Sequence, residues 1–359
     1  MLCGWALIAK AFGSQLNSCT PPSAPAAKRP ITGRRWRTEQ NVTGYRNALP
    51  QLGGGLFLTD GGLETTLIFH QGLELPDFAA FPLLDSEEGT EALRKYFKTY
   101  AELAKRFGTG LILESPTWRA NPDWGAKLGY SADALAAANR QAIQLLEEIR
   151  CRYQAEREMV ISGCLGPRRD GYVVDRAMSV QEAQDYHRQQ IETFAGTSAD
   201  MVCAVTLNYS EEAIGIARAA QQADLPAAIS FTVETDGKLP GGQSLHAAIE
   251  HLDDMTSGYP SYYMINCAHP THFAHLLDEG GAWLERIRGL RANASRKSHA
   301  ELDESSELDR GDPVALGREY ADLKKRLPQL CVLGGCCGTD HRHIEQIAGT
   351  CLPLFRSAN

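Results

Sequence analysis

Two adjacent cysteines, Cys336 and Cys337, are the residues of this chain best placed to do chemistry. The apolar run 331–333 precedes them and apolar residues at helical spacing follow, which predicts a strand, a glycine turn and a helix. Adjacent cysteines rarely bond to each other, but two thiolates aimed inward by such a turn can bind one soft metal ion, and zinc is its natural occupant. The alternative is a pair of buried structural thiols, because free cysteine is among the most buried residue types.

The elements that must position these thiols alternate regularly along the chain. Apolar runs of strand length occur at 55–59, 111–114, 160–163, 201–206, 227–231, 262–266, 287–290 and 331–333. Helical patterns lie between them at 93–107, 131–149, 179–196, from 210 and at 246–255. The polar, charged stretch 295–312 between the last two strands is predicted to be a solvated loop insertion. Strand and helix repeated eight times predict a (β/α)8 TIM barrel, a single domain over 46–359. A doubly wound open sheet is the alternative, although no G-x-G-x-x-G follows the first strand.

In such a barrel, the polar residues at strand ends share one rim, where chemistry is placed. They are Asp60, Glu114, Thr206, Asn208, Cys267, Cys336 and Cys337. Cys267 is therefore the expected third metal ligand, and Asn266 before it is expected to orient the ligands through hydrogen bonds. His269 and His272 are rival ligands beyond the same strand end.

Three thiolates on a zinc ion give a site of net charge about −1, which is poor for activating water. Such a site suits an incoming thiol, which loses its proton on binding and stays nucleophilic, so the predicted chemistry is alkylation of a substrate thiol. A zinc hydrolase would need histidine or carboxylate ligands. A non-catalytic, zinc-stabilised barrel would need a fourth ligand, because structural zinc sites are normally closed.

Three motifs carry a family resemblance: Asp60-Gly61-Gly62, Asn266-Cys267 and the run 334–339, Gly-Gly-Cys-Cys-Gly-Thr. They resemble the hallmarks of the homocysteine S-methyltransferase family, which includes betaine–homocysteine methyltransferase and the homocysteine domain of methionine synthase. The resemblance spans roughly residues 52–348. It implies a barrel, zinc held by Cys267, Cys336 and Cys337, and homocysteine bound to that zinc through sulfur. It also implies that Asp60 holds the substrate ammonium and that the glycine amides after it, from Gly61 on, lie near the substrate carboxylate.

One position departs from the family pattern. Several family members carry a glutamate before the residue that matches Thr206, where this chain has Val205, whereas Glu114 stands where a neutral polar residue is common. The carboxylate that helps to hold the substrate ammonium is therefore predicted to have moved to Glu114, with Thr117 and Asn208 as further substrate contacts. Otherwise Glu114 is a salt-bridged structural residue, or the acceptor is another thiol or a selenol.

The methyl donor predicted from the family's simpler members is S-methylmethionine or S-adenosylmethionine, and the product is methionine. Trp118 and Trp124 are candidates for lining the path of an onium donor, because aromatic faces attract cations; ordinary packing is the alternative. The length leaves no room for a separate cobalamin or folate module.

The composition narrows the partners to small molecules. The chain has 359 residues, 43% hydrophobic and 22% charged, with a net charge of −8. No basic face suggests nucleic acid, no apolar run reaches the length of a membrane span, and ten scattered cysteines favour a reducing, cytoplasmic location. Residues 1–45, rich in proline and locally basic, are predicted to be a disordered extension without a catalytic role. The sequence leaves the oligomeric state open.

Overall fold

The computed structural model describes residues 44–305 and 307–356, in which eight parallel strands close into a barrel in chain order. The predicted fold is therefore confirmed, and every predicted strand is present. The strands are β1 (Phe57–Leu58), β2 (Gly110–Glu114), β3 (Met159–Leu165), β4 (Met201–Leu207), β5 (Ala227–Phe231), β6 (Tyr262–Asn266), β7 (Ile287–Ala292) and β8 (Val332–Gly335). β8 pairs with both β7 and β1, which closes the ring.

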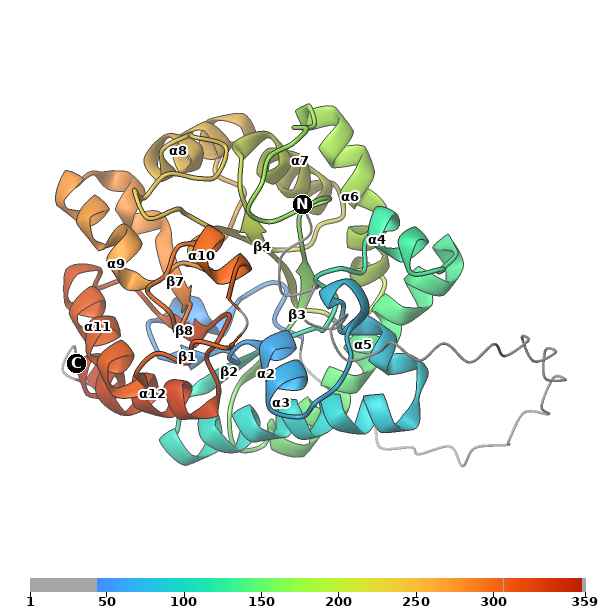
Figure 1. The fold of residues 1–359 in the computed structure, drawn as a ribbon, viewed down its shortest axis with the longest axis horizontal. Coiled ribbons are helices and arrows are strands. Elements are labelled where there is room, and N and C mark those ends of the chain that lie inside the picture. Colours follow the sequence, from blue (N-terminus) through green and yellow to red (C-terminus); the bar gives the residue numbers. More distant parts are fainter. Residues whose placement is uncertain (1–43, 306, 357–359) are drawn as a thin grey trace, which may run out of the picture.

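Helices form a ring around these strands (Figure 1). They are α2 (Leu63–Phe69), α3 (Glu87–Phe107), α4 (Pro122–Lys127), α5 (Ala132–Tyr153), α6 (Val180–Ala195), α7 (Ser210–Gln222), α8 (Leu245–Thr256), α9 (Pro270–Phe273), α10 (His299–Asp303), α11 (Pro313–Arg326) and α12 (His341–Arg356). Short 3-10 turns occupy η1 (Pro50–Gly53), η2 (Pro76–Phe78), η3 (Phe81–Asp85), η4 (Ala274–Glu279) and η5 (Ala282–Arg286).

The ends of the helices follow local sequence chemistry. Ser179 and Glu182 form a capping box at the start of α6, as the sequence predicts. Gly108 ends α3 with a φ of 73°, a left-handed conformation that glycine adopts without a Cβ penalty. These signals fix where helices begin and end, and so the length of the loops that reach the rim.

Side chains of the strands alternate between two apolar cores. The larger core lies between strands and helices, and the smaller one fills the barrel interior, where Ile112, Cys164, Cys203 and Met264 lie. Because side chains alternate with period two, Glu114 follows Ile112 on the interior face. Polar side chains at the carboxyl ends of the strands thus point into one mouth of the barrel.

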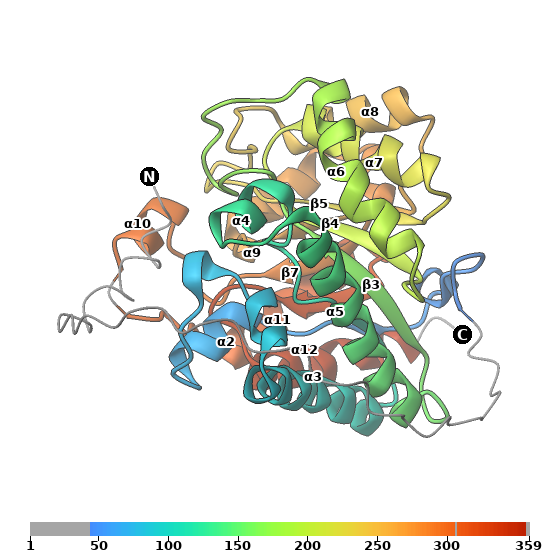
Figure 2. The same cartoon turned by 90° about the vertical axis from the view of Figure 1, so that its right-hand side faces the viewer.

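The segment 295–312 differs from its prediction as a solvated loop. It contains α10, which begins with a capping box between Ser298 and Glu301, and His299 within it is buried. Figure 2 places α10 at the same end of the barrel as α2. Most charged residues of the segment are exposed, but His299 and Leu302 are buried and line the cavity. Composition alone does not show which polar residue of such a segment is buried.

The predicted N-terminal extension lies almost wholly at residues 1–43, outside the described residues. At residue 45 the main-chain nitrogen of Tyr45 already donates to the Asp200 carboxylate over 2.7 Å. None of the helices in the described part of the chain combines the length and apolarity that crossing a membrane requires.

Candidate active site

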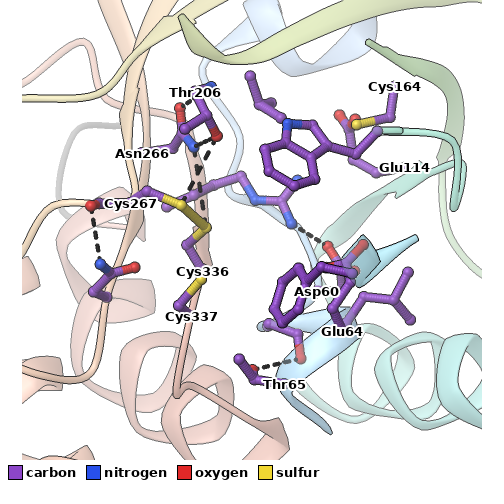
Figure 3. Close-up of a pocket in the computed structure, with 18 of the residues that line it drawn as sticks. Asp60, Glu64, Thr65, Glu114, Cys164, Thr206, Asn266, Cys267, Cys336 and Cys337 are labelled. Atoms are coloured by element: carbon purple, nitrogen blue, oxygen red, sulfur yellow. Dashed lines mark hydrogen bonds and ion pairs between the residues drawn. A yellow bond between two sulfur atoms is a disulfide. The ribbon is translucent and has the colours of Figure 1, made fainter. Parts of the chain in front are cut away.

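Three cysteine sulfurs meet at the mouth of the barrel. Cys267 directly follows β6, Cys336 and Cys337 directly follow β8, and their Sγ atoms all lie within 4.8 Å of one another. Cys267 and Cys336 are joined as a disulfide, with their Cα atoms 5.4 Å apart, and Cys337 is a free thiol. Figure 3 shows the cluster on one side of a cavity of about 90 Å³. The sequence did not predict the disulfide.

The chemistry of this donor set fits zinc once the disulfide is reduced. Zn–S bonds of about 2.3 Å in a tetrahedral arrangement hold sulfurs roughly 3.8 Å apart, a spacing within the limit that the three sulfurs satisfy. Burial raises the pKa of the Cys337 thiol to about 12, so this thiol keeps its proton at neutral pH unless a cation binds beside it. The site therefore suits a soft dication with one position left for a ligand.

Asn266 and Thr206 support the sulfur cluster from β6 and β4. The Asn266 Oδ1 accepts from the Thr206 main-chain nitrogen over 2.8 Å, and its Nδ2 donates to the Thr206 hydroxyl, also over 2.8 Å. That hydroxyl donates to the Cys267 sulfur over 3.9 Å, and the Asn266 Nδ2 lies 4.0 Å from the Cys336 sulfur. Asn266 thus contacts both sulfur-bearing loops, directly or through Thr206.

The backbone is strained at two of these residues. Thr206 has a φ of 63° and Cys267 a φ of 53°, in the left-handed region that β-branched residues rarely enter. Strain of this kind persists only where the surroundings enforce it, and it concentrates at functional sites. The amide of Asn266 supplies that enforcement at Thr206 through its two hydrogen bonds.

The rival histidine ligands lie outside the sulfur cluster. The His269 Nε2 lies 3.2 Å from a Glu319 carboxylate oxygen, and His272 Nε2 pairs with the Arg296 carbonyl over 2.9 Å. In the described part of the chain, the cysteine cluster is the one group of three or more side chains arranged to hold a metal. These histidines therefore serve the packing of α9 and its neighbours.

An ion pair faces the sulfurs across the cavity. The Arg291 Nη2, from β7, lies 2.5 Å from the Asp60 Oδ1, and the Tyr96 hydroxyl donates to the Asp60 Oδ2 over 2.9 Å. Burial raises the pKa of Asp60, an effect that the Arg291 charge opposes. Both oxygens of the carboxylate predicted to hold an ammonium thus already have partners.

Two further carboxyl groups, Glu64 and Glu114, line the cavity. Burial is the main cause that raises the pKa of each to about 7. The Ser162 and Cys164 side chains contact the Glu114 carboxyl and oppose the rise of its pKa, but its Oε2 is buried without a hydrogen-bond partner. Val205 presents an apolar side chain to the same cavity, so the capacity of Glu114 to accept a hydrogen bond from a ligand is that of Oε2.

The other predicted substrate contacts differ in where they lie. Gly61 lines the cavity, whereas Thr117 and Asn208 do not. The Thr117 hydroxyl donates to the Cys164 carbonyl over 2.8 Å, and the Asn208 Nδ2 donates to the Asp170 carbonyl over 3.0 Å. Both side chains thus bind loop carbonyls behind the rim, and their contact with a substrate stays a prediction.

The two tryptophans do not offer open faces to an onium donor. The Arg119 guanidinium lies 4.3 Å from the Trp118 ring centroid and 3.8 Å from that of Trp124. Trp118 lines the cavity but Trp124 does not. The cation–π partner expected from a donor is thus supplied by the chain itself, which favours the packing alternative for both rings.

Sequence reasoning missed Arg291, Glu64 and His299, which all line the cavity. The His299 Nε2 lies 2.6 Å from the Cys267 carbonyl oxygen and its Nδ1 lies 3.0 Å from a Glu234 carboxylate oxygen, so α10 is tied to the loop that carries Cys267. The strand period could have indicated Arg291. A Cβ on Gly289 would point at Met264 in the barrel interior, and Arg291, two residues later on the same strand, therefore faces the interior as well.

Comparisons with known proteins agree with this geometry. A family model described as Homocysteine S-methyltransferase matches residues 57–351. Homocysteine S-methyltransferase 4 of Zea mays is 23% identical over 319 residues, covering 82% of this chain and 89% of the plant protein. Two crystal structures of the Escherichia coli homocysteine methyltransferase MmuM are similar in fold. The oxidized form has a TM-score of 0.67 at 20% identity, covering 84% of this chain and 98% of MmuM. The metallated form has a TM-score of 0.63 at 20% identity, covering 82% and 96%.

Proposed function

This chain belongs to the homocysteine S-methyltransferase family, and we propose that it methylates homocysteine to methionine with S-methylmethionine or S-adenosylmethionine as the donor. The proposal includes a zinc ion held by the thiolates of Cys267, Cys336 and Cys337. The observation that carries it is the convergence of three cysteine sulfurs, from the ends of β6 and β8, at the mouth of one cavity.

Zinc bound there would supply a Lewis acid that lowers the pKa of a substrate thiol while the thiolate ligands keep the bound sulfur nucleophilic. The chain's own part is to hold three sulfurs in reach of one another and to exclude water. Cys267 is 3% exposed, and His299 and Leu302 of α10 line the cavity and help to cover it. A dry mouth favours the reaction, because attack on an onium carbon quenches charge in the transition state.

Glu114 is proposed to bind the substrate ammonium. Its Oε2 is buried and unpartnered, and a buried ammonium needs an acceptor that Val205 cannot provide. Asp60 is a weaker candidate than the family pattern implies, because Arg291 already offsets its charge and Tyr96 takes its second oxygen. The carboxylate that binds the ammonium would then lie on β2, whereas the family pattern places it on β4.

The acidic lining also favours a cationic donor. Four carboxyl groups line the cavity, those of Asp60, Glu64, Glu114 and Asp303, against two guanidinium groups, those of Arg119 and Arg291, so carboxyl groups exceed the guanidinium groups. A cation entering this cavity would favour ionisation of Glu64 and Glu114. The donor is thus predicted to be an onium compound, and the reducing, cytoplasmic setting of the enzyme stays a prediction.

A second acceptor class is worth testing because Val205 lines the cavity where an acid would bind the amino group. Another thiol, or a selenol, is the alternative substrate. The experiment is a methyl-transfer assay of reduced, zinc-loaded protein with homocysteine against S-methylmethionine and S-adenosylmethionine. Methionine formed with either donor supports the proposal. Failure with both donors, while another thiol is methylated, would replace homocysteine as the acceptor.

A further inference from the structure

Arg291 is one of two buried arginines that line the cavity, and its position is set by neighbouring main chain. It occupies the next-to-last position of β7, and its Nε donates to the Gly335 carbonyl oxygen over 3.2 Å. Its Nη2 pairs with Asp60, which follows β1, the strand on the other side of β8. The side chain therefore crosses the strand that leads to Cys336 and holds its guanidinium close to the metal-binding turn.

The guanidinium has donors to spare. Arginine carries five N–H donors, and hydrogen bonds within the described residues engage two of its three nitrogens, Nε and Nη2. Nη1 has no hydrogen-bond partner in the described part of the chain, and Arg291 lines the cavity. An arginine fork of this kind matches the two oxygens of a carboxylate.

One of the donors expected for a substrate carboxylate is, by contrast, already engaged. The main-chain nitrogen of Gly62, one of the amides that the family resemblance placed near that carboxylate, donates to the Thr339 carbonyl over 3.0 Å. The second cavity-lining arginine, Arg119, is stacked against two tryptophan rings and donates its Nη1 to the Arg169 carbonyl over 3.1 Å. Arg291 is the cation left facing the acidic end of the cavity.

We propose that Arg291 binds the carboxylate of the substrate thiol while Glu114 binds its ammonium, so that the two residues together recognise a zwitterionic amino acid. The proposal rests on the proposed function in taking the acceptor to be an amino-acid thiol. Neither charge of the zwitterion is then buried unpaired, and the Asp60–Arg291 pair remains intact as the support that orients the guanidinium.

The test compares binding of three thiols to reduced, zinc-loaded protein by calorimetry. They are homocysteine, 4-mercaptobutanoate, which lacks the ammonium, and 3-aminopropane-1-thiol, which lacks the carboxylate. Arg291→Lys keeps the positive charge beside Asp60 but loses the fork. We expect it to weaken the first two thiols roughly ten- to a hundredfold and to leave the third within about twofold.

Arg288→Lys is the matched control, because Arg288 lies near the opposite end of the same strand and does not line the cavity. It should leave the affinity for all three thiols at the parent value. Equal weakening of all three thiols by Arg291→Lys would show that Arg291 only supports Asp60, and unchanged affinities would show that it binds no ligand. Either result overturns the proposal.

A double variant, Asp60→Asn with Arg291→Gln, removes both charges together and guards against misfolding from an unpaired buried charge. It should show the same selective loss for the two carboxylate-bearing thiols. If the parent binds 4-mercaptobutanoate in an Arg291-dependent way yet never methylates homocysteine, the proposed function fails while the role of Arg291 stands.

Discussion

The two sides of the cavity are built by different means. On one side, three sulfurs come from two short segments of chain, the residue after β6 and the two residues after β8. On the other side, the charged residues come from three distant stretches of chain, Asp60 and Glu64 from the β1–α2 segment, Glu114 from β2 and Arg291 from β7, and they meet only when the barrel closes.

This difference separates metal binding from substrate selection. The sulfur side needs correct turns and a supporting amide, and under the proposed function it would hold its metal whatever the substrate is. The charged side has no metal to organise it, so its geometry depends on one buried ion pair and on which carboxyl group is left without a partner. Substitutions on one side should therefore leave the function of the other largely intact.

The largest effect is expected from the cysteines. Cys267→Ala, Cys336→Ala or Cys337→Ala should each remove most of the bound zinc and lower methyl transfer more than a hundredfold, because two thiolates do not hold zinc as three do. Metal analysis of the reduced protein and circular dichroism provide the check, with the barrel expected to survive since the site lies at the rim.

Cys151→Ala is the matched control for these variants. Cys151 is an exposed thiol on α5, and its removal should change neither zinc content nor activity. Zinc loading of the parent should also require a reductant, because Cys267 and Cys336 are joined in this structure. Stoichiometric zinc in all three rim variants would rule out the ligand assignment.

Glu114→Gln should have the next largest effect, on the charged side alone. Loss of a charge-assisted hydrogen bond of about 1.5–3 kcal/mol should weaken homocysteine binding roughly ten- to a hundredfold. Zinc content and the affinity for 4-mercaptobutanoate should stay at the parent values. Glu88→Gln, on the exposed first turn of α3, is the control. If Glu114→Gln keeps the parent affinity for homocysteine and Asp60→Asn loses it, then Asp60, not Glu114, binds the ammonium.

Asn266→Ala should weaken zinc binding roughly tenfold. This effect is smaller than that of losing a cysteine, because Asn266 orients the ligands and does not itself bind the metal. The substitution removes both hydrogen bonds that hold Thr206 against the Cys267 sulfur. Competition with a chelator measures the change. The relative affinities for the three thiols should be unchanged, so an altered preference among them would contradict the separation of the two sides.

The smallest effect concerns stability of the metal-free protein. Burial raises the pKa of Glu114 from its ordinary value of 4.5 to about 7, so over this range the folded state keeps a proton that the unfolded state loses. The contribution of Glu114 to the free energy of unfolding is therefore fully present below pH 4.5. As the pH rises to 7, the free energy of unfolding falls by roughly 1–3 kcal/mol. Glu114→Gln should flatten denaturation midpoints over that pH range, and an unchanged pH profile would show that Glu114 is ionised throughout.

The sequence predicted the barrel because most of its strands are buried parallel strands that read as continuous apolar runs, with β7, which contains Arg288 and Arg291, as the exception. Its error at 295–312 had a physical cause. His299 in that segment is polar but buried, since both of its ring nitrogens have partners, Glu234 and the Cys267 carbonyl. A polar residue in the sequence predicts exposure to solvent only if the fold supplies no hydrogen-bond partners for it.

The same reasoning explains which parts of the site were predictable. Cys336 and Cys337 share one motif with the glycines that allow their turn, so adjacent residues carry the signal. Arg291 pairs with Asp60 across a separation of 231 residues, and the pair depends on closure of the ring between β8 and β1. No local pattern encodes which buried carboxylate an arginine will neutralise.

Strand β1 contributes two residues to the barrel. It pairs with each neighbouring strand at two positions. Along the seam with β8, the nitrogens of Phe57 and Thr59 donate to the carbonyls of Cys331 and Leu333, and the nitrogen of Gly335 donates to the carbonyl of Asp60. Short, sparsely bonded elements open at lower free energy than the rest of a fold. Asp60, which lies two residues beyond β1, is fastened to Arg291, so the ion pair also closes this seam. In hydrogen–deuterium exchange, the amides of Phe57 and Thr59 should therefore exchange faster than those of central strands such as β3, and faster still when Arg291 is replaced.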